Sequence, residues 1–112
     1  MGLKANIENI LVQLQYPVNE STTKQLEAVA KETNDFFTIA NHLFNLRDSL
    51  VPVNGLVALS NSVNRIKIKS LSNNESEIKK FEEIVKKWAD KYKVALQKVE
   101  GKNTYYILGK HN

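Results

Sequence analysis

The side chains best suited to chemistry in this chain are hydrogen-bonding and cationic groups, which fall in two short runs. The first run offers donors and acceptors at helical intervals: Thr38, Asn41, His42 and Asn45. On a helix these positions share one face. In the second run, Arg65, Lys67 and Lys69 stand at alternate positions, which would place three cations on one face of a strand. Both patterns indicate binding rather than catalysis.

Catalytic chemistry has little support in the sequence. The chain has no cysteine and two histidines, His42 and His111, and its four glycines stand apart, so no glycine-rich phosphate loop is present. No cluster of His, Asp and Glu at helical spacing predicts a zinc site. The paired glutamates within residues 75–83 interleave with lysines, which is typical of surface ion pairing. We therefore expect no enzymatic activity, no metal and no cofactor.

Length and composition predict one domain spanning residues 1–112. An apolar share of 42% and a charged share of 25% are typical of soluble globular proteins. The N-terminal residues lack the pattern of a secretory signal, and no apolar run approaches the roughly 20 residues that span a bilayer. Together with the absence of cysteine, these features predict a cytoplasmic protein with no membrane partner.

The charge is concentrated in the C-terminal half. Residues 1–56 carry four basic and six acidic side chains, a net charge of −2, whereas residues 57–112 carry twelve basic and six acidic, a net +6. The two halves give the overall charge of +4. A basic half favours a polyanionic partner through long-range attraction. A solubilising lysine surface is the alternative interpretation.

The N-terminal half predicts three helices. Apolar residues recur at helical intervals within residues 6–15, 21–33 and 36–50. Pro17 ends the first helix and Pro52 ends the third, because the proline ring removes a backbone donor and disfavours a helical residue before it.

Two polar signals delimit the second helix. Asn19 or Ser21 can cap its N-terminus by accepting a hydrogen bond from an unpaired amide. Asn34 and Asp35 predict the break before the third helix, since both residue types tolerate left-handed backbone.

The C-terminal half predicts a hairpin within residues 55–71, a long helix over 75–92 and a second hairpin within 94–109. Asn74 is the expected cap of the long helix, with Glu77 completing a capping box. The predicted fold class is therefore α+β, with three N-terminal helices, a hairpin, a long fourth helix and a final hairpin whose strands are antiparallel.

The long helix has an apolar seam with two possible uses. Its members recur at intervals of three and four residues: Ile78, Phe81, Val85, Trp88 and Tyr92. The seam can close the domain's own core, or Phe81, Val85, Trp88 and Tyr92 can form the interface of a homodimer.

Residues 29–34 follow a known order of residue types. Val29-Ala30-Lys31-Glu32-Thr33-Asn34 corresponds to apolar-Ala-x-x-Thr-Gly, with Asn34 at the usual glycine. With this pattern and its order of elements, the chain through residue 92 resembles the winged helix-turn-helix superfamily of DNA-binding domains, in particular small bacterial regulators and plasmid-partition adaptors. It departs from the family pattern in a shorter turn and in Phe36-Phe37 at the start of the third helix.

The resemblance implies a role for each run. The third helix would read double-stranded DNA with its outward side chains. These are Thr38, Asn41, His42, Asn45 and Arg47, the last being the only cation in the helix. Arg65, Lys67 and Lys69 would contact phosphates from the hairpin as a wing. The winged-helix-like core would span residues 3–92, with an extra hairpin at 93–109. A homodimer would present two reading helices about 34–36 Å apart. The resemblance thus implies a transcriptional regulator or a replication or partition adaptor. Such a protein would bind a specific DNA sequence or prefer AT-rich sites.

Two other interpretations stay open. Exposed aromatic residues, such as Phe36, Phe37 and the pair Tyr105-Tyr106, could bind a second protein in a non-enzymatic interaction module. Alternatively, the strand at residues 65–70, the long helix and the last hairpin could form a split β-α-β unit that binds RNA.

Overall fold

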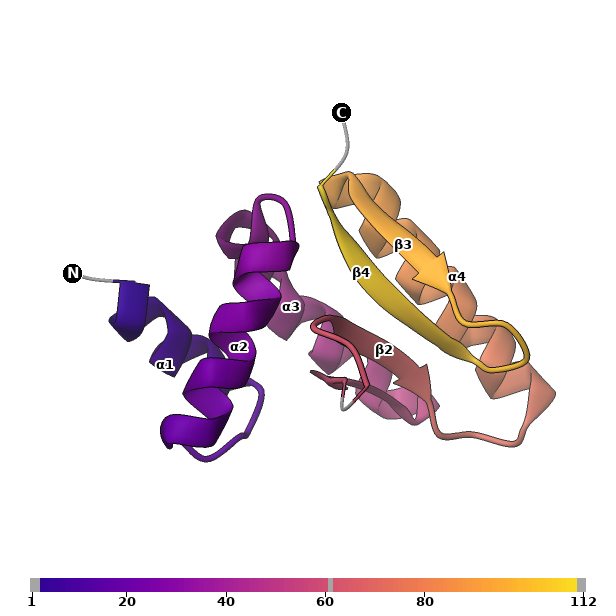
Figure 1. Ribbon diagram of the computed structural model, residues 1–112. Coiled ribbons are helices and arrows are strands. Elements are labelled where there is room, and N and C mark those ends of the chain that lie inside the picture. Colours follow the sequence, from indigo (N-terminus) through magenta and orange to yellow (C-terminus); the bar gives the residue numbers. More distant parts are fainter. Residues whose placement is uncertain (1–2, 61, 111–112) are drawn as a thin grey trace.

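The computed structural model describes residues 3–60 and 62–110, with side chains from residue 6 onwards. The described elements are α1 (Leu3–Gln13), α2 (Glu20–Glu32), α3 (Phe36–Leu50), the 3-10 helix η1 (Val51–Val53), β1 (Gly55–Leu59), β2 (Ile66–Ser70), α4 (Glu75–Tyr92), β3 (Val94–Lys98) and β4 (Thr104–Lys110). The predicted α+β class and order of elements are confirmed. In Figure 1, α3 and α4 lie behind the sheet, and α2 and then α1 stand beside it.

The signals that delimit α1 and α2 act as predicted. α1 ends at Gln13, and Gln15 takes a positive φ of 65° before Pro17. Of the two possible caps, Asn19 is the one used: its side chain accepts from the Thr22 amide, and the Thr22 hydroxyl accepts from the Asn19 amide. This reciprocal pair satisfies two backbone donors that would otherwise lack partners at the helix start.

The predicted break between α2 and α3 is present, and one of the two residues named for it takes the left-handed backbone. Asp35, rather than Asn34, has left-handed backbone, with φ 54° and ψ 36°. Asn34 instead forms a parallel bridge with Gly109, and its backbone carbonyl accepts a 3.1 Å hydrogen bond from the Lys110 amide. The Asn34 side-chain amide donates back to the Lys110 carbonyl, also at 3.1 Å. Because pairing with β4 fixes Asn34, the chain reversal moves to the next residue.

The four strands in the described part of the chain form one antiparallel sheet in the order β1-β2-β4-β3. The hairpin predicted as a wing is therefore not a free ribbon, since β2 pairs with β1 on one side and β4 on the other. The final hairpin, predicted as an addition outside the winged-helix-like core, completes the same sheet. β2, α4 and β3, with β4 inserted between the two strands, make a split β-α-β unit.

The N-terminus of α4 is capped as predicted, but Glu77 has a different role. Asn74 accepts a 3.1 Å hydrogen bond from the Glu77 amide. The Glu77 carboxylate accepts from the Ser72 hydroxyl at 2.7 Å and from the Asn54 side-chain amide at 3.2 Å, and so does not return to the Asn74 amide. These bonds, Ser72 first, lower the pKa of Glu77.

One face of the sheet forms the core with α3 and α4. Ile66 and Ile68 of β2 and Phe81 and Val85 of α4 are buried there. The packing leaves no room at Gly55, where an added Cβ would lie 2.9 Å from a Phe81 ring carbon and from the Leu50 Cβ. The core therefore fixes which side chains of the sheet point the other way.

Candidate nucleic-acid interface

The other face of the sheet, called the outer face below, points towards the viewer in Figure 1, and no helix is drawn across it. The strand pairing and alternation place these residues on it: Leu56, Ala58, Lys67, Lys69, Gln97, Thr104, Tyr106 and Leu108. On β2 the predicted separation of cations from isoleucines is confirmed, because Ile66 and Ile68 are buried while Lys69 is exposed and Lys67 is half-buried. The lysine side chains therefore end at the surface of an open sheet.

A shallow hollow of about 170 Å³ lies on the outer face. Its lining consists of hydroxyl groups, lysines, one tyrosine and one valine: Ser60, Ser62, Lys67, Lys69, Val99, Lys102, Thr104 and Tyr106. Two of the lysines come from β2 and the third from the turn before β4, so two segments contribute cationic side chains to one hollow. No carboxylate is among these lining residues, so their positive charges are not neutralised within the hollow.

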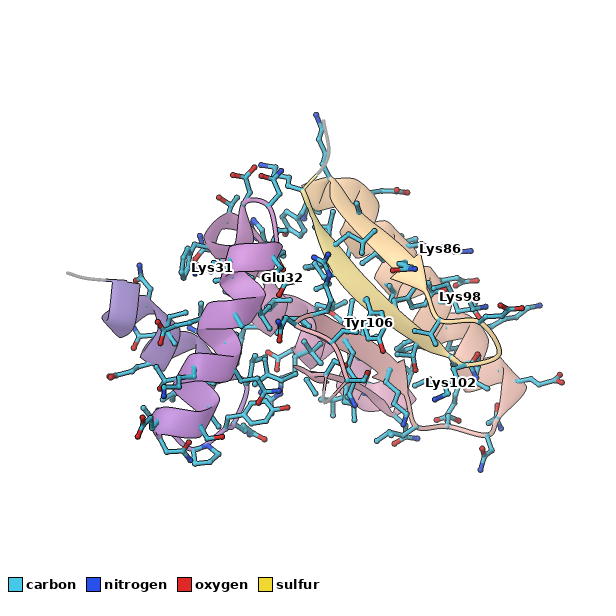
Figure 2. All side chains as sticks on the ribbon, viewed as in Figure 1. Lys31, Glu32, Lys86, Lys98, Lys102 and Tyr106 are labelled. Atoms are coloured by element: carbon cyan, nitrogen blue, oxygen red, sulfur yellow. The ribbon has the colours of Figure 1, made fainter. Side chains whose placement is uncertain are left out.

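Tyr106 occupies the centre of the outer face. It lies on β4, opposite Lys67 of β2 and Gln97 of β3. Its hydroxyl shares a 3.4 Å hydrogen bond with the Ser62 hydroxyl, which in turn lies 3.2 Å from that of Ser60. Hydrogen bonds to Ser62 and Ser60 lower the pKa of Tyr106, and the positive charges of Lys102 and Lys67 act in the same direction. The Tyr106 hydroxyl therefore lies near two serine hydroxyls and two lysine charges. Figure 2 labels Tyr106 on this face, with Lys102 near the β3–β4 turn.

Arg65 does not join Lys67 and Lys69 as a free cation. One guanidinium nitrogen, Nη1, donates to the backbone carbonyls of Glu32 at 2.6 Å and of Leu108 at 3.1 Å. Arg65 therefore ties the end of α2 to β4. The prediction that Arg65 contacts phosphate overlooked these two backbone acceptors, which are distant in sequence.

The outward residues of α3 divide into free and engaged side chains. Thr38, Asn41 and Asn45 are exposed, as a reading helix requires. His42 instead stacks on Tyr92 of α4, with ring centroids 3.6 Å apart and planes 13° apart. Arg47 donates to the Gln13 carbonyl of α1 at 3.4 Å. Both side chains therefore have partners within the chain, and contact of His42 and Arg47 with DNA stays a prediction.

A groove of about 410 Å³ runs between α1 and α3. Uncharged groups line it: Asn6, Asn9, Ile10, Gln13, Phe37, Thr38, Ala40 and Asn41. Amides can bond to many partners, but the lining supplies no cation for a phosphate.

The amides of α3 and the lysines of β2 lie on opposite sides of the core. α3 turns Leu43 and Leu46 inward, which leaves Asn41 and Asn45 on the side directed away from the core. Lys67, in contrast, projects from the uncovered face of the sheet. The expectation of a reading helix beside a charged ribbon is thus corrected: the two sets of groups do not form one continuous surface.

The apolar seam of α4 serves the chain's own core. Phe81 and Val85 are fully buried, and Trp88 is buried with its indole N–H donating to the His42 carbonyl at 3.0 Å. Tyr92 is half-buried. Of the two uses predicted for the seam, this is the one found within a single copy, and pairing of two copies through α4 stays a prediction.

The aromatic residues predicted for protein binding are less exposed than expected. Phe36 and Tyr105 are buried in the core, and Phe37 packs against it. On α3, Phe44 is more exposed than Phe36 and Phe37, with 43% of its surface accessible. The sequence patterns did not indicate it as a binding residue.

Sequence reasoning also missed Lys102 and Thr104 as members of the hollow. Lys102 lies in a turn, where alternation assigns no face. The sequence pattern that could have indicated Lys102 is weak, since it is only a lysine directly after Gly101. Gly101 has a φ of 75° and lies where the hairpin reverses.

Comparisons with known proteins assign no family to the chain. No family model matches the chain, and no curated protein or solved structure matches it either. Within the described residues, none of the helices has the length and apolar character needed to cross a membrane.

Proposed function

We propose that this protein is a non-enzymatic nucleic-acid-binding protein that contacts the phosphodiester backbone with the outer face of its sheet. The observation that carries the proposal is the hollow that Lys67, Lys69 and Lys102 line with no carboxylate among the lining residues. Such groups bind a polyanion by displacing its condensed counterions, which gives affinity without requiring a particular base sequence.

The surroundings of the three lysines favour a polyanion over an isolated anion. The lysines sit in the half of the chain with a net charge of +6, so the attraction extends beyond the hollow. Lys67 and Lys69 are two residues apart on one strand, about 7 Å along its axis, and can therefore bind different phosphates.

Reading of double-stranded DNA through α3, by a homodimer as in winged helix-turn-helix proteins, is a second candidate. Exposure of Thr38, Asn41 and Asn45 favours it, because asparagine can pair bidentately with adenine. Its electrostatics are mixed: Arg47 is engaged with α1, and the pocket beside Asn45 is lined by Asp48 as well as by Lys87 and Lys91 of α4.

Binding of fluorescent oligonucleotides at two salt concentrations tests the proposal. The key variant replaces Lys67, Lys69 and Lys102 with Ala. We expect its affinity at about 50 mM salt to fall on the order of 100-fold, and the slope of log K against log salt to become shallower by about 2, because each lost phosphate contact removes roughly 0.7.

The matched control replaces three exposed lysines of α4, Lys79, Lys80 and Lys87, and so removes the same charge from residues that do not line the hollow. A specific contact surface predicts a much smaller loss for this control. If the two variants lose the same affinity, the loss depends on net charge and not on the hollow. Absence of binding by the wild type at low salt would exclude the proposal and favour a protein-interaction module.

A further inference from the structure

Resting on the proposed function, we infer that the ligand is single-stranded nucleic acid, with one base stacked on Tyr106 while Lys67, Lys69 and Lys102 hold the flanking phosphates. The assignment follows from the position of the ring among the cations.

Tyr106 is the aromatic residue of the outer face, and it lies on a central strand. β4 is flanked by β2 and β3, so the ring has sheet on both sides and lysines at its borders. It remains half-buried rather than covered. Every base has an aromatic face, so a half-exposed ring among cations offers both contacts that a single strand needs.

The hydroxyl contact with Ser62 reduces the entropic cost of stacking. The contact is long, at 3.4 Å, so it adds modestly to the ordering that the half-buried position already gives the ring. Gln97 opposite Tyr106, and Thr104 beside Lys69, supply donors and acceptors that can meet the edges of a splayed base.

A duplex uses this surface less well. Its bases are stacked on one another, so a ring at the centre of a shallow sheet face could reach them only after unpairing, which costs a few kcal/mol. A continuous duplex would meet the lysines through its backbone and leave Tyr106 without a partner. The same face therefore favours a strand whose bases are free.

The test compares Tyr106→Leu with Tyr106→Phe on three probes of equal length: single-stranded oligothymidine, the matching duplex, and an abasic strand that keeps the phosphates. An oligouridine arm distinguishes RNA from DNA. We expect Y106L to weaken oligothymidine binding about 5- to 150-fold, the range for loss of one stacked base. Y106F keeps the ring and should stay within about threefold of the wild type, since only a hydroxyl bond is lost.

Two further readouts separate stacking from a general structural effect. Y106L should leave the salt slope unchanged, because no phosphate contact is removed. On the abasic strand, the wild type and Y106L should bind equally. Equal affinity of the wild type for duplex and single strand, or an equal loss for Y106L on abasic and thymidine strands, would overturn the inference.

These outcomes are distinguishable from failure of the proposed function. If binding depends on the lysines but not on Tyr106, the phosphate-binding face stands and the single-strand assignment is wrong. If the wild type binds none of the probes at low salt, both fail. Circular dichroism and urea denaturation of each variant establish that it is folded.

Discussion

The exposed side of α3 and the outer face of the sheet offer different chemistry to a nucleic acid. α3 presents uncharged groups such as Asn41 and Asn45, and the pocket beside Asn45 is lined by Asp48 as well as by two lysines of α4. The sheet instead presents three lysines around a tyrosine, with no carboxylate in the hollow. Amides discriminate between base edges but supply little long-range attraction, while ammonium groups attract any phosphate. The comparison teaches that the residues best suited to reading and the residues best suited to binding need not share a surface.

The largest expected effect concerns the joint between the two regions. Gly109→Ala should reduce the free energy of unfolding by about 2–4 kcal/mol, because a side chain is strained at a φ of 146° and its Cβ would lie 2.9 Å from the Asn34 amide nitrogen. Urea denaturation measures the change. Gly101→Ala is the control: its φ is 75° but nothing lies within 4 Å, so a cost of about 1–2 kcal/mol is expected. Equal costs would show that the Asn34–Gly109 contact contributes little.

A smaller effect is expected when the arginine of the basic strand is removed. Arg65→Ala should reduce the free energy of unfolding by about 1–3 kcal/mol, because the Glu32 and Leu108 carbonyls lose a charged donor. The folded variant should lose less affinity for oligonucleotides than Lys67→Ala does, in titrations at low salt. A loss as large as that of Lys67→Ala, without a change in stability, would return Arg65 to the contact surface.

The smallest effect is expected on α3. Replacing Asn41 and Asn45 with Ala should change the affinity for single strands and for duplex DNA by less than about twofold, since neither amide lies on the lysine face. A loss of about 1–3 kcal/mol for a cognate duplex in the same titration would instead show base reading. That result would make α3 the main surface and reverse the comparison.

Local signals predicted much of the fold. The alternation of Ile66, Lys67, Ile68 and Lys69 correctly gave the two faces of β2, because alternation depends only on the pleat of a strand. The Asn19 cap followed from the chemistry of a helix start in the same way.

What the sequence could not reveal depends on contacts between distant residues. Nothing near Arg65 indicates that the Glu32 and Leu108 carbonyls will be within reach. Likewise, His42 has the spacing of a reading residue, and only the packing of α4 against α3 places Tyr92 on its ring. Local patterns fix the face on which a side chain lies, whereas its partner is set by the tertiary fold.

The sheet order has a consequence for the nascent chain. β4 occupies an inner position, yet it leaves the ribosome after every other strand described here. Until it emerges, one edge of β2 has unpaired amides and carbonyls. Asn34, in the α2–α3 turn, also lacks its bridge partner Gly109. We therefore expect the growing polypeptide to need protection from aggregation until that segment is made, and the slow step of refolding to be the insertion of this strand.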